Sequence, residues 1–554
     1  MRPGRPQQAE GLPHTSIGYM LYLMRTLLLL SAMGSLFGQD VTFDRLLHTD
    51  REPQNWLTYS GAVNGQRYSP LTQVTPANVK NLELQWVWQA KSVEKFETTA
   101  LVVNGVLYTV QAPNDVYALD AVTGRIFWTL PYTPAPEARP CCGRVNRGLA
   151  ILGDTLYMGT LDAHLLAIDS KNGKIIWNTT AGNAADRYAI THAPLIVKDK
   201  VIVGMAGGDG PIRSYIAAFD AKTGKEAWRF YTIPGPGEPG NETWSGDSWK
   251  TGGAAIWNTG AYDPDTNLTF WGIGNPAPDT NGDIRLGDNL YSDSVVALDA
   301  DTGKLKWYYQ FTPHDTMDYD STQVPVLADI DYQGRPRKVM MWANRNGLFY
   351  VLDRITGQFL LGKPFVKANW LTGFDERGRP IRTAGQQDSP VPLLVQPNGL
   401  GGTNWYPPSY SPHTGLFYIP GWENSGTMVQ KNGGFGRSTG DTPMAQPNLV
   451  PNRKTDAEGY GIVRAFDPKT GDMKWEYKMN DITWAGVLST ASDLVFSGGR
   501  EGYFFALDGK NGNLLWKQQL GGQVNSGPMS YMIDNRQYIA VAAGSALFVY
   551  ALRQ

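Results

Sequence analysis

The sequence predicts an all-β protein with the architecture of a β-propeller. Two observations support this fold class. A short phrase recurs along the chain, and the composition is rich in turn residues and tryptophan, with 62 Gly, 36 Pro and 18 Trp among 554 residues. A solenoid is the structural alternative, but the repeats lack helical periodicity.

The recurring phrase is a small residue, an apolar residue and Asp, then a Thr/Asn-Gly step, then Trp. Each copy predicts a strand, a tight turn and a second strand, because Asp can accept hydrogen bonds from turn amides and Gly supplies a positive φ. The Trp can pack against a neighbouring unit. The copies run from Ala118, Ala167, Ala218, Ala297, Ala465 and Ala506 to Trp128, Trp177, Trp228, Trp307, Trp475 and Trp516. A degenerate copy, Val351 to Leu360, lacks the tryptophan.

Unequal spacing between the copies predicts long insertions, mainly in 229–296 and 361–464. Insertions of this kind lie in loops on one face of a repeat protein. The Pro- and Gly-rich run 234–240 is strongly loop-forming, and a loop-rich stretch at 428–454 could lie over a binding site as a lid. No domain boundary is evident inside 39–554, which is therefore predicted to be one propeller domain.

The N-terminus has the parts of a secretory signal. Arg25 precedes a short apolar run, 26–38, that ends in a small residue, and we expect cleavage near Gly38. The residues before Met20 resemble an upstream extension, so 1–38 is predicted to be a signal peptide with that extension. An uncleaved membrane anchor is the alternative, although the run is short for a bilayer span. No later segment is apolar enough to cross a membrane.

Charge and cysteine content exclude several classes. The net charge is -2, with 49 basic and 51 acidic residues, so nothing indicates nucleic-acid binding. The only cysteines, Cys141 and Cys142, are adjacent, which excludes a Cys-x-x-Cys-His haem site and a zinc cluster. A bond between neighbours closes almost no loop and gives little stabilisation. Either the two residues are bonded for a local function, or they are reduced, buried thiols acting as small hydrophobes.

Four further motifs accompany the adjacent cysteines and the tryptophan-rich repeats: 55–61 (NWLTYSG), 274–278 (GNPAP), 344–347 (NRNG) and 402–405 (GTNW). Together they resemble the PQQ-dependent alcohol dehydrogenases, the quinoprotein methanol/ethanol dehydrogenase family, in its soluble type without a haem domain. The resemblance extends from about Asn55 to the C-terminus. It implies an eight-bladed propeller with the quinone and a metal ion on the central axis.

The resemblance also implies contacts to PQQ. Cys141 and Cys142 match a pair that forms a disulfide ring over one face of the quinone, and Trp257 matches the tryptophan over the other face. PQQ carries three carboxylates and carbonyl oxygens, so donors and cations are expected around its rim. The other implied cofactor residues are Glu97, Arg147, Thr191, Gly207, Gly208, Arg345, Asn404, Trp405 and Trp484. For each of these, the alternative is a blade residue that satisfies turn amides.

The implied metal ligands are Asp209, Asn275 and Asp318, all hard oxygen donors suited to Ca²⁺ or a similar ion. Two departures from the family pattern stand out: Asp209 replaces a glutamate, and Ala206 stands where some members have serine. Asp318 and Asp320 would point to the same side of an extended strand, so both could reach one ion. This extra acid resembles the lanthanide-dependent branch; the alternative is a turn or rim residue in a calcium enzyme.

A third acidic segment, Asp279, Asn281 and Asp283, superficially resembles a calcium loop. The twelve-residue EF-hand spacing is absent. We therefore predict that these residues form a surface loop.

The function implied by the resemblance is periplasmic oxidation of a small primary alcohol to an aldehyde, by hydride transfer to PQQ. The metal would polarise a quinone carbonyl, Asp318 would act as general base, and Arg345 would stabilise negative charge. Electrons would pass to a periplasmic cytochrome c, and a homodimer is compatible with the sequence. The alternatives are a polyol or aldehyde dehydrogenase with the same cofactor, or a non-catalytic quinoprotein-like scaffold, which would not need the adjacent cysteines, Asp318 or Arg345.

Overall fold

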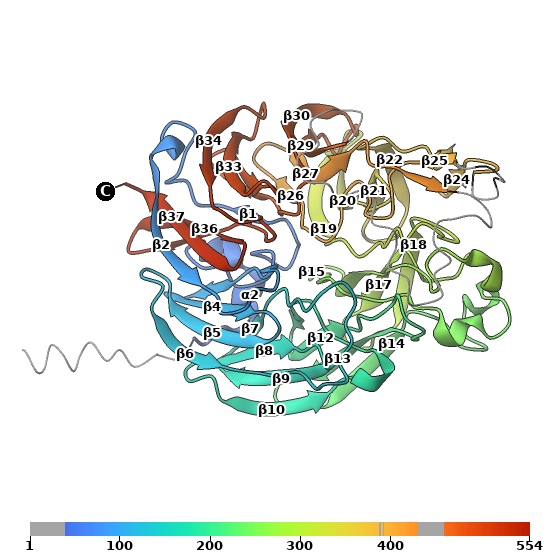
Figure 1. Ribbon diagram of the computed structural model, residues 1–554, viewed down its shortest axis with the longest axis horizontal. Helices are drawn as coiled ribbons and strands as arrows, with labels where there is room; N and C mark the ends of the chain where they lie inside the picture. The colour runs from blue at the N-terminus through green and yellow to red at the C-terminus, as the bar shows by residue number, and fades with distance from the viewer. Residues whose placement is uncertain (1–38, 387–388, 390, 392, 430–458, 554) are drawn as a thin grey trace, which may run out of the picture.

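The computed structural model describes residues 39–386, 389, 391, 393–429 and 459–553. Within these residues, eight sheets, each built on four antiparallel strands, surround a central axis as the blades of a propeller (Figure 1). The predicted all-β, eight-bladed propeller is therefore confirmed. The predicted signal segment, 1–38, and nearly all of the predicted lid, 428–454, lie outside the described residues.

Each blade runs from a buried inner strand to a more exposed outer strand. The first four blades are β3 (Leu101–Val103), β4 (Val106–Gln111), β5 (Asp115–Asp120) and β6 (Ile126–Leu130); β7 (Ala150–Leu152), β8 (Thr155–Gly159), β9 (His164–Asp169) and β10 (Ile175–Thr180); β11 (Leu195–Val197), β12 (Lys200–Gly204), β13 (Tyr215–Asp220) and β14 (Glu226–Tyr231); and β15 (Ala261–Asp263), β16 (Leu268–Gly272), β17 (Ser294–Asp299) and β18 (Leu305–Gln310).

The next three blades are β19 (Val326–Tyr332), β20 (Arg335–Ala343), β21 (Leu348–Asp353) and β22 (Phe359–Pro364); β26 (Ser409–Ser411), β27 (Leu416–Glu423), β29 (Tyr460–Phe466) and β30 (Met473–Met479); and β31 (Leu488–Thr490), β32 (Leu494–Gly498), β33 (Tyr503–Asp508) and β34 (Leu514–Gln519). A short strand, β1 (Tyr68–Ser69), adds in parallel to β31.

The last blade joins the two ends of the propeller. It consists of β35 (Met529–Ile533), β36 (Arg536–Ala543), β37 (Ala546–Leu552) and, as its outer strand, β2 (Leu82–Gln89). β2 pairs antiparallel with β37, with Leu82 opposite Leu552 and Gln89 opposite Ala546 (Figure 1). The ring is thus closed by strands far apart in sequence, which leaves no open end between the first and last blades.

The remaining elements lie in the connections. The helices are short: α2 (Phe43–Leu47) and the 3-10 helices η1 (Thr49–Arg51), η2 (Val79–Asn81), η3 (Ala184–Asp186), η4 (Asn241–Thr243), η5 (Ser248–Thr251) and η6 (Gly282–Ile284). Two small sheets, β23 (Leu371–Phe374) with β24 (Pro380–Arg382) and β25 (Leu393–Val395) with β28 (Thr427–Val429), occupy the second predicted insertion. Among the described residues, no helix is long and apolar enough to cross a membrane.

The tryptophans of the repeats dock each blade onto the next. Trp128 Nε1 donates a hydrogen bond to Ser170 O at 2.9 Å, and its ring lies on the turn glycine of the following blade. A Cβ at Gly173 would lie 2.6 Å from that ring, and the φ of Gly173 is +74°. Both the close contact and the positive φ therefore favour glycine at this position. Trp177 repeats the arrangement, donating to Ala221 O at 3.1 Å. The predicted docking role of the tryptophans is confirmed.

The degenerate copy keeps the docking geometry with a different residue. Leu361, not the predicted Leu360, pairs with Val351 as Trp128 pairs with Ala118, and its side chain faces Gly471. The spacing from Val351 to Leu361 equals that from Ala118 to Trp128, so the predicted copy ended one residue too early.

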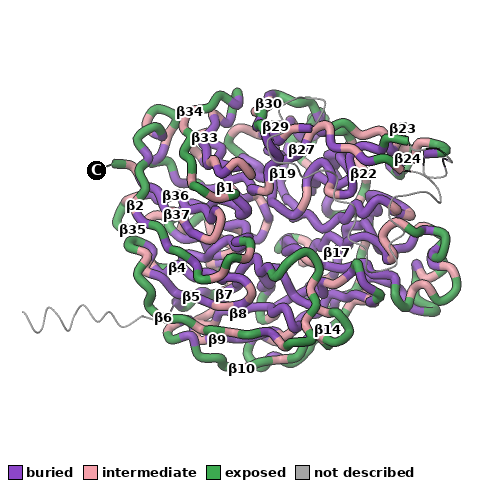
Figure 2. Tube along the Cα trace, viewed as in Figure 1, coloured by how far each residue is buried: buried purple, intermediate pink, exposed green. Residues whose placement is uncertain are grey.

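Burial follows the layering of the blades (Figure 2). β4 is buried along its whole length, because both of its faces pack against other strands, whereas no residue of β6 is buried. The blades therefore form a rigid frame. The connections that lead into the inner strands of the blades carry most of the predicted site residues.

Candidate functional site

The adjacent cysteines form a disulfide, so the interpretation as reduced, buried thiols is wrong. Both residues are exposed, and Cys142 Sγ lies 3.9 Å from Asp209 Oδ2. A covalent ring that closes no long loop contributes little to the stability of the fold. Its position beside a predicted metal ligand favours the local function that the sequence suggested.

One group of predicted residues surrounds the Arg147 guanidinium; we call Glu97, Arg147, Thr191, Trp257 and Trp405 the Arg147 cluster. Arg147 Nη2 lies 2.8 Å from Glu97 Oε2, while Nη1 donates to Trp257 O at 3.0 Å and to Thr191 Oγ1 at 3.2 Å. Five different connections, each leading into the inner strand of a blade, supply these residues, so only the closed propeller brings them together.

Two indole rings flank the same guanidinium. Arg147 Cζ lies 5.1 Å from the ring centroid of Trp257 and 5.0 Å from that of Trp405, within the range of a cation–π contact. Asn258 Nδ2 donates to Trp405 O at 3.0 Å, and Asn404 Oδ1 accepts from Trp405 N at 2.9 Å. Asn404 therefore holds the backbone of a site tryptophan.

The Arg147 cluster has a hydrogen-bond donor available for an anionic ligand. Burial raises the pKa of Glu97, and the positive charge of Arg147 opposes that rise. Arg147 Nε is buried and has no hydrogen-bond partner among the described residues. A buried donor without a partner is costly unless something accepts from it. The cluster thus fits a flat, acidic group such as PQQ.

A second group gathers around Arg345; we call Asp209, Asn275, Asp279, Asp318, Asp320 and Arg345 the Asp318 cluster. Arg345 Nη2 lies 2.7 Å from Asp318 Oδ2, Nη1 pairs with Asp320 Oδ2, and Nε donates to Gly399 O at 2.6 Å. Asp318, Asp320 and Arg345 are all buried. One guanidinium therefore fixes two carboxylates side by side.

The backbone conformation that brings Asp318 and Asp320 together differs from the prediction. They do not lie on an extended strand: Asp318 has a φ of +61°, and the segment between β18 and β19 is a loop. The Asp315 carboxylate accepts from Met317 N at 2.9 Å and from Tyr319 N at 2.7 Å. These bonds fold the chain tightly in front of Asp318, and the strand interpretation is wrong for that reason.

Asn275 is tied to this loop through its backbone. Its N–H donates to Asp320 Oδ1 at 2.9 Å, so both Asp320 oxygens have protein donors. The preceding residue must be glycine, since a Cβ at Gly274 would lie 2.2 Å from Asp320 Oδ1. The GNPAP motif therefore brings the Asn275 amide close to the carboxylates.

Asp279 is the site residue that the sequence interpretation missed. Asn281 and Asp283 are exposed, as predicted for a surface loop, but Asp279 is half-buried and its Oδ1 accepts from Asn275 Nδ2 at 2.9 Å. The prediction of a surface position is wrong for Asp279. Its closeness in sequence to Asn275, within one compact turn-forming motif, was the available signal.

The Asp318 cluster carries excess negative charge. Burial, followed by repulsion from Asp320, raises the pKa of Asp209 to about 6, against the opposing charge of Arg345. Burial, followed by repulsion from Asp209 and Asp320, raises the pKa of Asp279 to about 7. Burial is also the main reason why the pKa of Asp318 lies well above its usual range. The cluster contains four carboxylates but only one guanidinium among the described residues, so this oxygen-rich donor set fits a multivalent hard cation.

One loop connects the two clusters. Gly399 O accepts a hydrogen bond from Arg345 Nε, and Gly402 N donates to Arg345 O at 2.9 Å, while Trp405 at the end of the loop lies over Arg147. A Cβ at Gly401 would lie 2.3 Å from Arg345 Cγ and one at Gly402 2.4 Å from Val366 Cγ2, so close packing requires glycine at both positions. The GTNW motif thus links both halves of the site.

Other predicted residues have more local roles. A Cβ at Gly207 would lie 2.2 Å from Arg187 O and one at Gly208 2.4 Å from Ala255 Cβ, so close packing requires glycine at both positions before Asp209. The Trp484 ring lies 4.5 Å from Lys95 Nζ, a cation that the sequence interpretation did not include.

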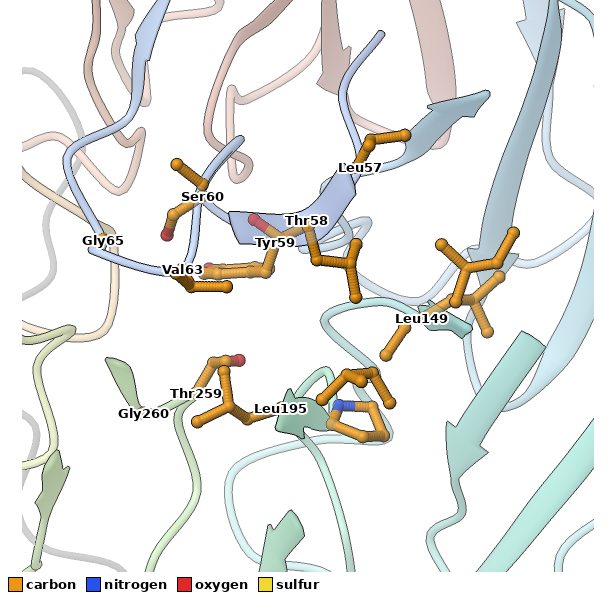
Figure 3. A pocket seen from close by; sticks show the side chains of 16 residues that line it. Leu57, Thr58, Tyr59, Ser60, Val63, Gly65, Leu149, Leu195, Thr259 and Gly260 are labelled. Carbon is orange, nitrogen blue, oxygen red and sulfur yellow. The ribbon is translucent and has the colours of Figure 1, made fainter. Parts of the chain in front are cut away.

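A small cavity lies apart from this chemistry (Figure 3). Its lining is largely apolar and comes from the segment around Leu57 and Val63 together with Leu149, Leu195 and Gly260. None of its lining residues belongs to either cluster. The candidate site is therefore defined by the two clusters and not by this cavity.

Comparison with known proteins gives the family. The family model described as "PQQ: Glucose/ethanol/alcohol dehydrogenase, beta-propeller domain" matches residues 56–363 and 478–539. The chain is 36% identical over 530 residues to the quinoprotein alcohol dehydrogenase PedH of Pseudomonas putida, covering 91% of this chain and 88% of the relative. It is 34% identical over 533 residues to the lanthanide-dependent methanol dehydrogenase of Methylacidiphilum fumariolicum, covering 90% and 86%.

Solved structures agree. The quinohemoprotein alcohol dehydrogenase of Comamonas testosteroni superposes with a TM-score of 0.84 at 33% identity, covering 93% of this chain and 83% of that chain. A europium-containing methanol dehydrogenase superposes with a TM-score of 0.82 at 30% identity, covering 92% and 100%.

The fold and the two clusters define a propeller enzyme built around an acidic cofactor and a cation. The chain belongs to the family of PQQ-dependent alcohol dehydrogenases. It is an alcohol-oxidising enzyme, and its family membership implies PQQ, a metal ion and an electron acceptor.

Proposed function

We propose that the chain oxidises a small primary alcohol to the aldehyde, with Asp318 as the general base. The observation that carries this proposal is the pairing of Asp318 with Arg345 at the edge of an oxygen-rich cluster. The chemistry supplied by bound PQQ would be that of a hydride acceptor, and that supplied by a bound metal ion would be Lewis-acid polarisation. The protein residues supply the remaining steps.

Asp318 would take the hydroxyl proton of the alcohol. Its Oδ2 is held by Arg345 Nη2 at 2.7 Å, which fixes the carboxylate and leaves Oδ1 to accept the proton. Because Arg345 is itself anchored to Gly399 O and Asp320, its position is set before substrate binds. Its fixed positive charge can stabilise negative charge that develops nearby.

The Arg147 cluster would bind the acidic rim of PQQ. Arg147 is held by Glu97, Thr191 and the Trp257 carbonyl, so its unpaired Nε has a defined direction. The indole of Trp257 and the Cys141–Cys142 disulfide would cover the two faces of the ring, with Gly207, Gly208, Asn404 and Trp484 as further contacts.

Asp209, Asn275, Asp318 and Asp320 would hold one Ca²⁺ or lanthanide ion. Three of these four residues are carboxylates, and Asp320 is the additional acid that supports a trivalent lanthanide over Ca²⁺. The similarity to two methanol dehydrogenases whose names state a lanthanide supports the same choice.

The cellular setting forms part of the proposal. The signal-like segment 1–38 supports export to the periplasm, with 39–554 as the mature catalytic domain. A periplasmic cytochrome c would then accept the electrons, and the assembly would be a monomer or a homodimer. N-terminal sequencing of the periplasmic protein and light scattering after gel filtration test these points.

The decisive experiment reconstitutes the protein with PQQ and either Ca²⁺ or La³⁺, and then measures ethanol oxidation with an artificial electron acceptor. Activity with La³⁺ alone supports the lanthanide site, and activity with Ca²⁺ alone overturns it. Polyols and aldehydes run in parallel test the alternative substrates. An absence of PQQ binding, measured by absorbance, would contradict the proposed cofactor site.

A further inference from the structure

We propose that Asp279 is a positioning residue that turns the side-chain oxygen of Asn275 toward the metal ion. This inference rests on the proposed metal site and concerns how that site is kept in shape. It assigns a function to a residue that departs from the surface loop expected from its sequence context.

The hydrogen bonds of Asn275 support this assignment. An asparagine amide presents one accepting oxygen and one donating nitrogen, and its orientation must be inferred from its partners. Asn275 Nδ2 faces two acceptors, Asp279 Oδ1 at 2.9 Å and Pro276 O at 3.4 Å. A carboxylate and a carbonyl can only accept, so the nitrogen must face them. The Asn275 oxygen is therefore the atom that remains for a cation.

The backbone of Asn275 is fixed independently. Its N–H donates to Asp320 Oδ1 at 2.9 Å, which links it to a second predicted metal ligand. With the main chain held by Asp320 and the amide nitrogen held by Asp279, the side chain has little rotational freedom. Groups behind metal ligands commonly fix orientation in this way, and their loss lowers metal affinity about 10–100-fold.

Asp279 is itself held from behind by Arg285, which is fully buried. Arg285 Nη2 donates to the carbonyl oxygens of Pro278 at 3.0 Å, Asp279 at 3.3 Å and Asp315 at 2.6 Å. The same guanidinium thus joins the Asp279 loop to the loop that carries Asp318. These bonds involve only the backbone of Asp279, so replacing its side chain should leave the loop folded.

The test compares Asp279→Ala with Asp279→Asn in the PQQ-loaded enzyme. La³⁺ affinity is measured by competition with a chelator, and bound La³⁺ per protein is counted by elemental mass spectrometry. Asparagine can still accept the hydrogen bond from Asn275 through its oxygen, whereas alanine cannot. We expect the La³⁺ dissociation constant to rise about 10–100-fold in the alanine variant and less than about fivefold in the asparagine variant.

Asp283→Ala is the matched control, because Asp283 is exposed in the same loop; its La³⁺ affinity should equal that of the wild type. Equal losses in both Asp279 variants would overturn the inference, since they would indicate that the charge or direct ligation matters. Wild-type affinity in the alanine variant would also overturn it. A wild-type protein that binds PQQ but no La³⁺ or Ca²⁺ would instead refute the proposed metal site, and this inference with it.

Discussion

The Arg147 cluster and the Asp318 cluster are built from the same kinds of residue but differ in charge balance. Arg147 faces one buried carboxylate, Glu97, and its remaining partners are a carbonyl, a hydroxyl and two indole rings. Arg345 pairs with two carboxylates, and two more, Asp209 and Asp279, lie close enough to repel their neighbours. The positive and negative side chains of the Arg147 cluster balance, whereas the Asp318 cluster contains more carboxylates than cations.

This difference in charge balance indicates that the two clusters bind different ligands. A balanced, preorganised cluster can bind a flat anion without rearranging, because its charges are already fixed. An unbalanced cluster of closely spaced carboxylates, two of them buried, is destabilised until a cation neutralises it or protons bind. We therefore expect Arg147 to act in cofactor binding and Arg345 in the metal-dependent chemistry. The loop that ends at Trp405 joins the two clusters. Four experiments test this division, beginning with the largest expected effect.

Replacing Asp318 with Asn removes the proposed base from the unbalanced cluster. We expect kcat to fall about 10²–10⁴-fold, the usual contribution of a positioned general base, while PQQ remains bound. Steady-state kinetics with a saturating alcohol and PQQ absorbance measure the two quantities. The exposed Asp283→Asn variant should keep wild-type kcat. A rate near wild type in Asp318→Asn would eliminate Asp318 as the base.

Removing the metal should destabilise the protein, because the carboxylates then lose their neutralising partner. A ligand held at 1,000 times its dissociation constant stabilises the folded state by about 4 kcal/mol. Thermal unfolding of PQQ-loaded protein before and after chelation measures this loss, and adding La³⁺ back should reverse it. An unchanged Tm after proven metal removal would contradict the view that the Asp318 cluster needs a cation to neutralise its carboxylates.

Acid should lower the stability of the folded protein through His192, which is fully buried next to Thr191 of the Arg147 cluster. Burial lowers the pKa of His192 to about 4, and Nε2 accepts from Gly204 N at 2.9 Å. Between about pH 6.5 and pH 4 the unfolded chain therefore binds a proton that the folded protein does not, so stability falls as pH falls, by up to about 3 kcal/mol at pH 4.

Urea unfolding across this pH range measures the His192 effect. The His192→Gln variant lacks the titrating ring, so its stability should decline less steeply between pH 6.5 and pH 4. Identical slopes for the two proteins would show that the acid sensitivity has another source.

Replacing Arg147 with Lys should weaken PQQ binding alone. A lysine ammonium cannot bond Glu97, Thr191 and the Trp257 carbonyl in the same fork geometry, so the PQQ dissociation constant should rise about 10–100-fold. La³⁺ affinity, measured by chelator competition, should stay the same because Arg345 is untouched. The exposed Arg229→Lys variant is the control for the charge-conserving change. A parallel loss of La³⁺ affinity would show that the two clusters are not separable.

Much of the fold could be predicted from local sequence. The Asp, Gly and Trp of each repeat act within one hairpin and its neighbour, so their spacing alone predicts the strand-turn-strand unit and its docking. The degenerate copy shows the limit of this approach. Leu361 stands where the other copies have tryptophan and faces Gly471, but without the tryptophan as a marker the copy was ended one residue early, at Leu360.

The site was predictable only as a set of residue types. The motifs identified Arg147, Arg345 and Asp318 by resemblance, but which groups face one another depends on loops from blades far apart in sequence. Asp279 was predicted to lie in a surface loop because the EF-hand spacing is absent around it; Arg285, six residues later, holds its backbone carbonyl at the site. The extended geometry expected for Asp318 failed because the Asp315 side chain captures the following amides.

By itself, the sequence determined the repeating hairpin, the propeller class and the family, since these depend on short-range spacing and on matching motifs. Only the tertiary structure decided the charge balance of the two clusters. Electrostatic free energy depends on distance and burial, and both are set when eight blades close into a ring through the pairing of β2 with β37.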